Sequence, residues 1–289
     1  TRDMPLAYAE MALQGKPGTE VKLSVLRVRQ SAEPQEVGLT RKALVFPQVE
    51  SSIVEPGIGH VVVRSLDRGK AREIKARIEG LRKQGAEKLI LDLRRVAVGP
   101  PEEGLAVADL FVDEGLLGYV EGQNVARREF RASAENTVSK LPMVVLINRG
   151  AARAAEVAAA ALLENKVCEV VGERSYGDAA IREPVKLRDG GAVILSIAKY
   201  YSPKGEAIQD NGVTPSVRVA GAEPPATAED EGIGPRTELS AAEDTILQKG
   251  IEVLTGRAAD VAQKNDLETA LEGAQGMSGP AVPLPGRPR

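Results

Sequence analysis

The chain has 289 residues, enough for one large domain with one or two small ones, and its hydrophobic (43%) and charged (27%) fractions are ordinary for a globular protein. Its net charge of −3 and its aromatic content of 3%, with no tryptophan, argue against nucleic-acid binding and base stacking. The single cysteine, Cys168, excludes an intrachain disulfide, and the single histidine, His60, excludes a multi-histidine metal centre, so we expect neither metal nor cofactor.

The first region, residues 1–42, is predicted to contain a short helix followed by two strands. Residues 4–14 have a helical pattern that begins after a capping aspartate and ends at a glycine. A Pro-Gly turn follows, then alternating apolar residues over 21–27 and a partner strand at 36–39. The chain starts at Thr1 without a charged and apolar leader, so we interpret it as a fragment or a processed product.

From residue 43 onward, strand and helix patterns alternate. A β-rich run at 58–66, a helical face over 69–84 and the apolar strand 88–93 together predict a β-α-β unit. Further elements are predicted at the following ranges: helices at 102–112 and 153–164, a strand hairpin at 117–131, and strands at 143–147, 168–171, 192–199 and 217–219. This alternation predicts an α/β fold with a layered core over residues 43–220.

The composition shifts after residue 220. Residues 221–238 are rich in Pro, Ala, Glu and Gly and are predicted to be a linker. Apolar residues recur at helical spacing within 239–256, which predicts one amphipathic helix that packs on the core or contacts another subunit. The last stretch, 257–289, ends in a Gly/Pro-rich segment and is predicted to be mostly disordered.

Several stretches of the chain, in this order, resemble those of one enzyme family. They are residues 15–21 (Gly-Lys-Pro-Gly-Thr-Glu-Val), 89–94 (Leu-Ile-Leu-Asp-Leu-Arg), 107–111 (Val-Ala-Asp-Leu-Phe), 142–157 and 198–215. On these blocks the chain is identified as a member of the carboxyl-terminal processing peptidases, the tail-specific serine proteases of peptidase family S41.

The resemblance implies the layered β-α-β core of the tail-specific proteases, of the crotonase-like ββα type, preceded by the C-terminal part of a PDZ-like module at 1–42. In such a module the carboxylate-binding loop and the strand that a peptide extends would lie upstream of Thr1. This chain alone is therefore not expected to bind a C-terminal tail in the usual way, and the peptide-binding residues are unknown. The family's usual setting implies the periplasm or the cell envelope.

The catalytic positions of the family fall on residues of a different kind. In active relatives the nucleophile is the middle serine of Ser-Ala-Ser-Ala-Ser-Glu-Ile, and the matching position here is Arg153. The base is the lysine of Phe-Gly-Lys-Gly, matched by Asp178, which lies 25 residues later, at the family's spacing. A glutamine that orients the lysine is matched by Arg182.

A Ser-Lys dyad needs a hydroxyl that attacks the carbonyl and a neutral amine that takes the proton. A guanidinium stays protonated, so Arg153 can be neither nucleophile nor base, and Asp178 has no hydroxyl at the matched position to activate. The loop that the resemblance implies for the oxyanion, Val98 and Gly99 with Ala154, has lost the first glycine of the family's pair.

These departures predict a pseudoprotease that binds a protein or peptide as a scaffold or regulator, within a homo- or hetero-oligomer and without nucleic acid or metal. We hypothesise that Arg153 and Asp178 form an ion pair across the former dyad. Cys168 is interpreted as a packed core thiol, and His60 as a strand side chain.

Two alternatives stay open. The first is an active serine-type endopeptidase with displaced catalytic residues, although each candidate nucleophile is better interpreted as a loop or helix-end residue. The second is an anion- or peptide-binding protein that uses the old cleft, although dispersed surface arginines with one ion pair are the simpler interpretation. The residues concerned are Ser139, Ser175 and Ser202 for the first alternative, and Arg149, Arg153, Arg174 and Arg182 for the second.

Overall fold

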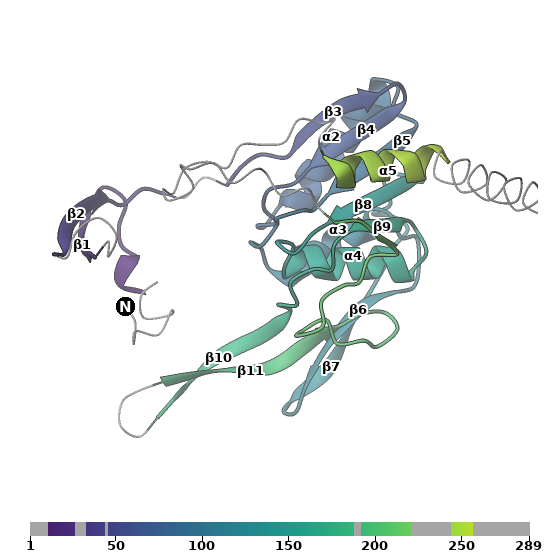
Figure 1. Cartoon of the computed structure of the whole chain (residues 1–289). Helices are drawn as coiled ribbons and strands as arrows, with labels where there is room; N and C mark the ends of the chain where they lie inside the picture. Colours follow the sequence, from purple (N-terminus) through teal and green to yellow (C-terminus); the bar gives the residue numbers. More distant parts are fainter. Residues whose placement is uncertain (1–10, 27–32, 44–45, 188–191, 221–243, 257–289) are drawn as a thin grey trace, which may run out of the picture. The chain divides into compact units, whose positions relative to one another are not determined.

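The computed structural model describes residues 11–26, 33–43, 46–187, 192–220 and 244–256 (Figure 1). By its internal contacts the chain divides into two compact units, Thr1–Phe46 and Pro47–Arg289. The sequence pattern predicts a boundary at residue 42, four residues before this division. The predicted linker at 221–238 and the predicted tail at 257–289 lie outside the described residues.

The first unit contains a two-stranded antiparallel hairpin. Strand β1 (Glu20–Val25) pairs with β2 (Gln35–Thr40), as the alternating pattern predicted. Residues 11–13 are helical, and the rest of the predicted helix at 4–14 lies outside the described residues. The guanidinium of Arg41 donates to the carbonyl oxygens of Leu13 and Glu20 at 2.8 and 2.9 Å and so ties the helical turn to the hairpin.

The second unit is built on a six-stranded sheet with the order β12-β9-β8-β5-β4-β3. Its strands are β3 (Glu50–Glu55), β4 (Ile58–Val62), β5 (Lys88–Asp92), β8 (Met143–Ile147), β9 (Glu169–Gly172) and β12 (Val217–Arg218). All neighbours are parallel except β3, which is antiparallel to β4. The predicted β-α-β unit is present as β4, α2 (Lys70–Lys83) and β5.

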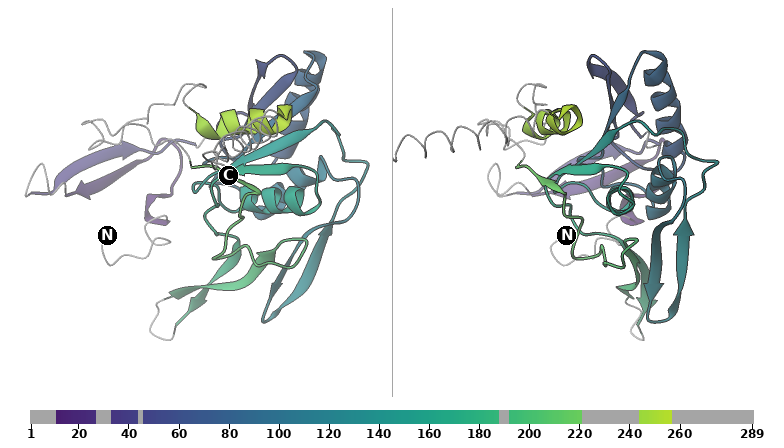
Figure 2. Two further views of the ribbon diagram at one scale, coloured as in Figure 1. Left: turned by 45° about the vertical axis from the view of Figure 1, so that its right-hand side comes forward. Right: turned by 90° about the vertical axis from the view of Figure 1, so that its right-hand side faces the viewer.

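Helices cover both faces of this sheet (Figure 2). Helices α2, α3 (Pro101–Asp109) and α4 (Ala154–Glu164) share one hydrophobic core with one face, and α5 (Thr245–Thr255) covers the other. Because successive strand residues point to opposite faces, β8 divides its side chains between the two cores: Val145 joins the first, while Val144 and Leu146 join the second. This explains the unbroken apolar run of β8.

Two of the helices approach each other closely at the start of α4. A Cβ atom built on Gly104 in α3 would lie 2.0 Å from the carbonyl oxygen of Ala154, so no larger residue fits there. The contact fixes the first residue of α4 against α3, and with it the chain segment directly before α4.

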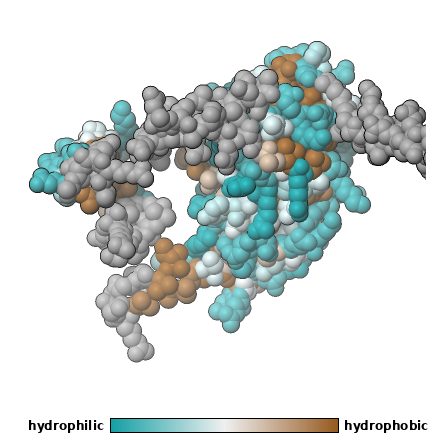
Figure 3. All heavy atoms as spheres, viewed as in Figure 1, coloured by the Kyte–Doolittle hydropathy of each residue, from teal (hydrophilic) through white to brown (hydrophobic). Residues whose placement is uncertain are grey.

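A second, four-stranded sheet has the order β10-β11-β6-β7, and its two hairpins extend away from the first sheet (Figure 1). Its strands are β6 (Leu116–Gly122), β7 (Val125–Arg131), β10 (Ala180–Lys186) and β11 (Ala192–Tyr201). Strand β10 was not predicted, because Pro184 and two charged residues interrupt its pattern; it tolerates proline because it is an edge strand. The exposed apolar side chains of the β10–β11 hairpin form a visible patch (Figure 3): Val185, Leu187, Val193, Ile194 and Leu195.

The architecture is thus a mixed α/β fold with several sheets; the α/β class was predicted, and the second, four-stranded sheet was not. Helix α5 forms the C-terminal part of the amphipathic helix predicted at 239–256, and residues 239–243 lie outside the described part of the chain. Within the described ranges, no helix is both long and apolar enough to cross a bilayer.

Candidate functional site

The predicted site residues lie at the carboxyl edge of the six-stranded sheet. Strands β5, β8 and β9 are parallel neighbours, so the loops that follow them meet at one edge. Backbone hydrogen bonds join these loops: the amide of Ala152 donates to Val96 at 2.8 Å, and the amide of Tyr176 donates to Ala151 at 2.9 Å. The three loops therefore form one framework around the start of α4.

Arg153 is the residue directly before α4 and has an unusual backbone conformation, with φ 55° and ψ −113°. A non-glycine residue at positive φ costs on the order of 1 kcal/mol, so neighbouring contacts must hold it. Its amide donates to the carbonyl of Asp178 at 3.1 Å and to the Oε2 of Glu156 at 3.0 Å. The main chain at this position is therefore fixed independently of the arginine side chain.

The structure brings Arg153, Asp178 and Arg182 together. Nε of Arg153 donates to Oδ2 of Asp178 at 3.1 Å, which is the ion pair hypothesised from the sequence. Nη2 of Arg182 lies 2.6 Å from Oδ1 of the same carboxylate. Burial alone would raise the pKa of Asp178, but the hydrogen bonds and charges of Arg182 and Arg153 outweigh it and hold the pKa below its usual value.

The buried carboxylate of Glu156 holds the loops of the site together through hydrogen bonds, a role that was not predicted from the sequence. Its side chain is completely buried and accepts four hydrogen bonds. Oε1 accepts from Ser175 Oγ and Gly177 N, both at 2.6 Å, and Oε2 accepts from the amides of Asp178 and Arg153. Burial raises the pKa of Glu156, while these donors favour the ionised form. A buried glutamate in the first turn of an alanine-rich helix was the available sequence signal.

The loop that the family resemblance matched to the oxyanion site is only partly connected to this cluster. Val98 is exposed, and its carbonyl accepts from the Leu66 amide at 2.8 Å. Gly99 has φ 129°, and a Cβ there would lie 1.9 Å from the carbonyl oxygen of Leu66. Ala154 is buried against α3. Among the described residues, no hydrogen bond joins Val98 or Gly99 to Arg153.

Ser175 and Ser202, two of the alternative nucleophiles, are both buried and engaged in hydrogen bonds. Ser175 donates to Glu156 at 2.6 Å and accepts from the amide of Val213 at 2.6 Å, so its hydroxyl serves the loop framework. Ser202 accepts from the amide of Glu206 at 3.1 Å. Neither hydroxyl faces a lysine in the described contacts.

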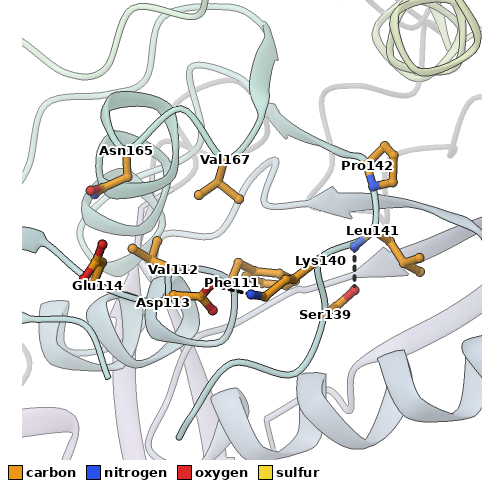
Figure 4. Close-up of a pocket in the computed structure, with 10 residues that line it drawn as sticks. All are labelled: Phe111, Val112, Asp113, Glu114, Ser139, Lys140, Leu141, Pro142, Asn165 and Val167. Carbon is orange, nitrogen blue, oxygen red and sulfur yellow. Dashed lines mark hydrogen bonds and ion pairs between the residues drawn. The ribbon is translucent and has the colours of Figure 1, made fainter. Parts of the chain in front are cut away.

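Ser139, the third alternative, lines a surface pocket of about 420 Å³ formed by the loops after α3, before β8 and after α4 (Figure 4). The pocket also contains Lys140, so it presents a serine and a lysine next to each other. Ser139 is buried and accepts from the amide of Leu141 at 3.2 Å, whereas Nζ of Lys140 pairs with Asp113 at 2.5 Å. A lysine held in an ion pair is a poor general base, so this pocket does not supply a Ser-Lys dyad.

A second buried charge network, also not predicted, lies at the same edge of the sheet. The carboxylate of Asp92 is 3.2 Å from Nε2 of His60 and 2.6 Å from Nη2 of Arg94. Arg94 in turn pairs with Asp244, the N-cap residue of α5, at 2.6 Å. Burial opposes ionisation of Asp92, but hydrogen bonds from His60 and Arg94 bring its pKa well below the usual range. His60 is a strand side chain, as expected.

The remaining predicted residues have simpler surroundings. Arg149 is 81% exposed and lies 3.5 Å from the Glu173 carboxylate, and Arg174 is exposed without an ion pair among the described residues. Cys168 is partly buried against the main core, and burial raises the pKa of its thiol to about 12. In the part of the chain that the structure describes, no group of three His, Cys, Asp or Glu side chains is placed to hold a metal ion.

Comparison with known proteins gives a consistent result. The family model described as peptidase family S41 matches residues 57–219. The carboxy-terminal processing protease CtpA of Bacillus subtilis is 33% identical over 218 residues, which are 75% of this chain and 46% of the relative. A carboxyl-terminal-processing protease of Synechocystis is 28% identical over 269 residues, 92% of this chain and 60% of the relative.

Among solved structures, the photosystem II D1 C-terminal processing protease superposes with a TM-score of 0.59 at 29% identity, over 75% of this chain and 60% of that protein. The chain thus spans less than two thirds of the length of these relatives. The family model nevertheless covers more than half of its residues, including every position of the cluster around Arg153. The chain belongs to peptidase family S41, the family of the carboxyl-terminal processing proteases.

Proposed function

We propose that this chain is a catalytically inactive member of its family that acts as a protein-binding scaffold or regulator. The observation that carries the proposal is the Arg153–Asp178–Arg182 ion-pair cluster. The sequence resemblance matches these three positions to the nucleophile, the base and the residue that orients the base. The cluster contains no hydroxyl and no amine, so it cannot carry out acyl transfer by a Ser-Lys mechanism.

The framework around the cluster supports the idea of a protease site whose main chain has been retained. The strained backbone at Arg153 and the four hydrogen bonds to Glu156 hold a sharp turn before α4, the kind of turn that exposes a nucleophile at the end of a strand. In this chain the turn presents an arginine.

An active endopeptidase with displaced catalytic residues is the alternative, and it is favoured by the names of the relatives, which are described as processing proteases. The hydrogen bonds of Ser139, Ser175 and Ser202 speak against it. None of these serines is paired with a lysine or an aspartate in the described part of the chain.

We further propose that residues 1–42 are the C-terminal part of a PDZ-like module, which the β1–β2 hairpin supports. The partner is proposed to be a protein or a peptide, and the setting the periplasm or cell envelope, both by family resemblance. Because the chain spans only part of its relatives, these proposals concern the whole protein to which the module belongs.

The proposal is tested by incubating the full chain with an unfolded protein that has an apolar C-terminal tail, beside the double variant Arg153→Ser, Asp178→Lys. We expect no cleavage by the natural chain. Cleavage gained by the variant would show that the oxyanion contacts are still usable. Cleavage by the natural chain that persists after substitution of Arg153 would refute the proposal. Far-UV circular dichroism of both proteins is the folding control.

A further inference from the structure

We infer that the carboxyl edge of the six-stranded sheet carries a surface that binds an acidic polypeptide segment of a partner protein. The surface consists of Arg95, Arg149, Arg153, Arg174 and Arg182, and is called the arginine surface below. The inference rests on the proposed function, because in a working protease this edge would be occupied by the substrate at the moment of cleavage. It adds the chemical class of the partner.

Backbone contacts place the main chain of Arg95 against the loop that carries Arg149. The amide of Arg95, in the loop after β5, donates to the side-chain oxygen of Asn148 at 3.0 Å. A Cβ built on Gly150 would lie 3.1 Å from the Cα of Arg95, so the loops after β5 and β8 touch there. Arg149 lies between these two contact residues.

The other three arginines continue this surface. Nε of Arg149 is 3.5 Å from the carboxylate of Glu173, the residue before Arg174 in the loop after β9. That loop then reaches Asp178, whose carboxylate contacts both Arg153 and Arg182. The five arginines thus come from the loops after β5, β8 and β9 and from the start of β10.

The charge of this surface is opposite to that of the whole chain. Five guanidinium groups face three carboxylates, those of Glu173 and Asp178 and the buried one of Glu156, which leaves an excess of two positive charges. The Asp92–Arg94–Asp244 network at the same edge carries one net negative charge and lowers this excess to one. The neighbouring pair of Lys199 and Asp210, 3.1 Å apart, adds no net charge. The chain as a whole carries a net charge of −3, so this positive excess is local.

The guanidinium groups are exposed and have unused donors. Side-chain exposure is 81% for Arg149, 52% for Arg153 and 35% for Arg182. Arg95 and Arg174 are exposed, and their side chains make no hydrogen bond or ion pair among the described residues. Each guanidinium has five donors in a planar fork that matches a carboxylate, so several carboxylates of an extended acidic segment find partners here.

These features favour an acidic peptide over other anions. High exposure is unlike the enclosed site that a small anion needs. Proteins that bind single-stranded nucleic acid stack successive bases on several aromatic rings, whereas Tyr176, 71% exposed, is a single exposed ring in the loop beside Arg174. A peptide with several carboxylates needs neither a cavity nor a stacking platform, and it contacts arginines on separate loops at the same time.

The test uses a fluorescein-labelled peptide of about 12 residues, rich in Glu with Gly and Ser between, and measures fluorescence anisotropy with the full chain at about 0.05 M salt. We expect saturable binding. The variant Arg149→Ala, Arg174→Ala should weaken it roughly five- to tenfold, because two exposed charge pairs are lost. The Arg149→Lys, Arg174→Lys variant should recover part of the affinity, because charge is kept but the planar fork is not.

A matched control removes two positive charges elsewhere. Lys75 and Lys83 on α2 form no ion pair among the described residues, so Lys75→Ala, Lys83→Ala should change the affinity less than twofold. Equal weakening by both double variants would mean a non-specific charge effect and would overturn the inference. Tighter binding of a single-stranded DNA of similar charge than of the peptide would also overturn the inference.

Failure of this inference is distinguishable from failure of the proposed function. A natural chain that cleaves unfolded protein and still loses peptide affinity in the Arg149→Ala, Arg174→Ala variant would overturn catalytic inactivity, and the arginine surface would stand. A chain that cleaves nothing and does not bind the acidic peptide would leave the proposed function in place and overturn the arginine surface.

Discussion

Glu156 offers the most direct test of how the cluster is held, through the substitution Glu156→Gln. The change keeps the volume of the side chain and replaces one carboxylate oxygen by an NH2 group. Both oxygens are in use: Oε1 accepts from Ser175 and Gly177, and Oε2 accepts from Asp178 and Arg153. If the NH2 group replaces Oε2, two backbone amides lose their acceptor. If it replaces Oε1, the Ser175 hydroxyl can turn, but the Gly177 amide cannot.

The magnitude follows from the number of donors that lose a partner. One or two buried N–H groups without an acceptor cost about 1–3 kcal/mol each, and the remaining bonds weaken because they are no longer assisted by charge. Burial, which raises the pKa of Glu156, opposes this loss, because a neutral side chain no longer has to ionise in the interior. We expect the free energy of unfolding to fall by about 2–4 kcal/mol.

The assay is urea unfolding at pH 7 followed by far-UV circular dichroism, with Glu79→Gln as the matched control. Glu79 is exposed on α2, so its substitution should change stability by less than about 0.5 kcal/mol. Hydrogen exchange measured by mass spectrometry over residues 173–180 gives a local readout, since the Gly177 and Asp178 amides should exchange faster in Glu156→Gln. A loss below about 1 kcal/mol with unchanged exchange would refute the account of the four-donor framework.

Three further predictions concern single residues. The pKa of Asp178 is lowered in the folded state, so its contribution to stability is present above the unfolded pKa of about 3.9 and is lost as pH falls through the folded pKa. Asp178→Asn should therefore be less stable than the natural chain at pH 7. A difference in stability that persists below pH ~2 would contradict this reasoning. Burial raises the pKa of the Cys168 thiol to about 12, so little of it is the reactive thiolate at pH 8. Cys168 should therefore react with iodoacetamide on the order of a thousandfold more slowly in the native chain than in urea, as measured by mass spectrometry. Near-equal rates would contradict the burial of the thiol. Asp244→Ala removes both the cap of α5 and the ion pair with Arg94, whereas Asp244→Asn removes only the ion pair. In thermal unfolding the Ala variant should be less stable than the Asn variant by about 1 kcal/mol. Equal stabilities of the two variants would mean that the cap contributes nothing.

The sequence was sufficient for elements with clear periodicity. The apolar run of β8 and the helical face of α2 gave their positions within a residue, because each buries a regular face. Strand β10 was missed because Arg182, Glu183 and Pro184 remove the alternation, and its place is determined by pairing with β11. The hydrophobic pattern of a short segment does not predict such a tertiary pairing.

The candidate site, too, was predictable from the sequence only in part. The pairing of Arg153 with Asp178 followed from opposite charges at two positions that must face each other, whereas the second partner, Arg182, was named only as a degenerate position. The central role of Glu156 could not be derived, because three of its four donors are backbone or side-chain groups of the 175–178 loop, whose course depends on β9. The chain of contacts from Asp92 through Arg94 to Asp244 likewise joins residues far apart in sequence.

Helix α5 has a consequence for how the protein is made. It alone among the described helices covers the face of the sheet formed by Ile58, Ile90 and Val144, and Nζ of Lys88 bonds to the carbonyl of Leu254 across 166 residues of chain. During synthesis, which runs from the N-terminus, the strands leave the ribosome long before this helix does. The apolar face therefore stays open to water and to chaperones until translation passes residue 255, and truncation before α5 should yield a chain that aggregates as it is produced.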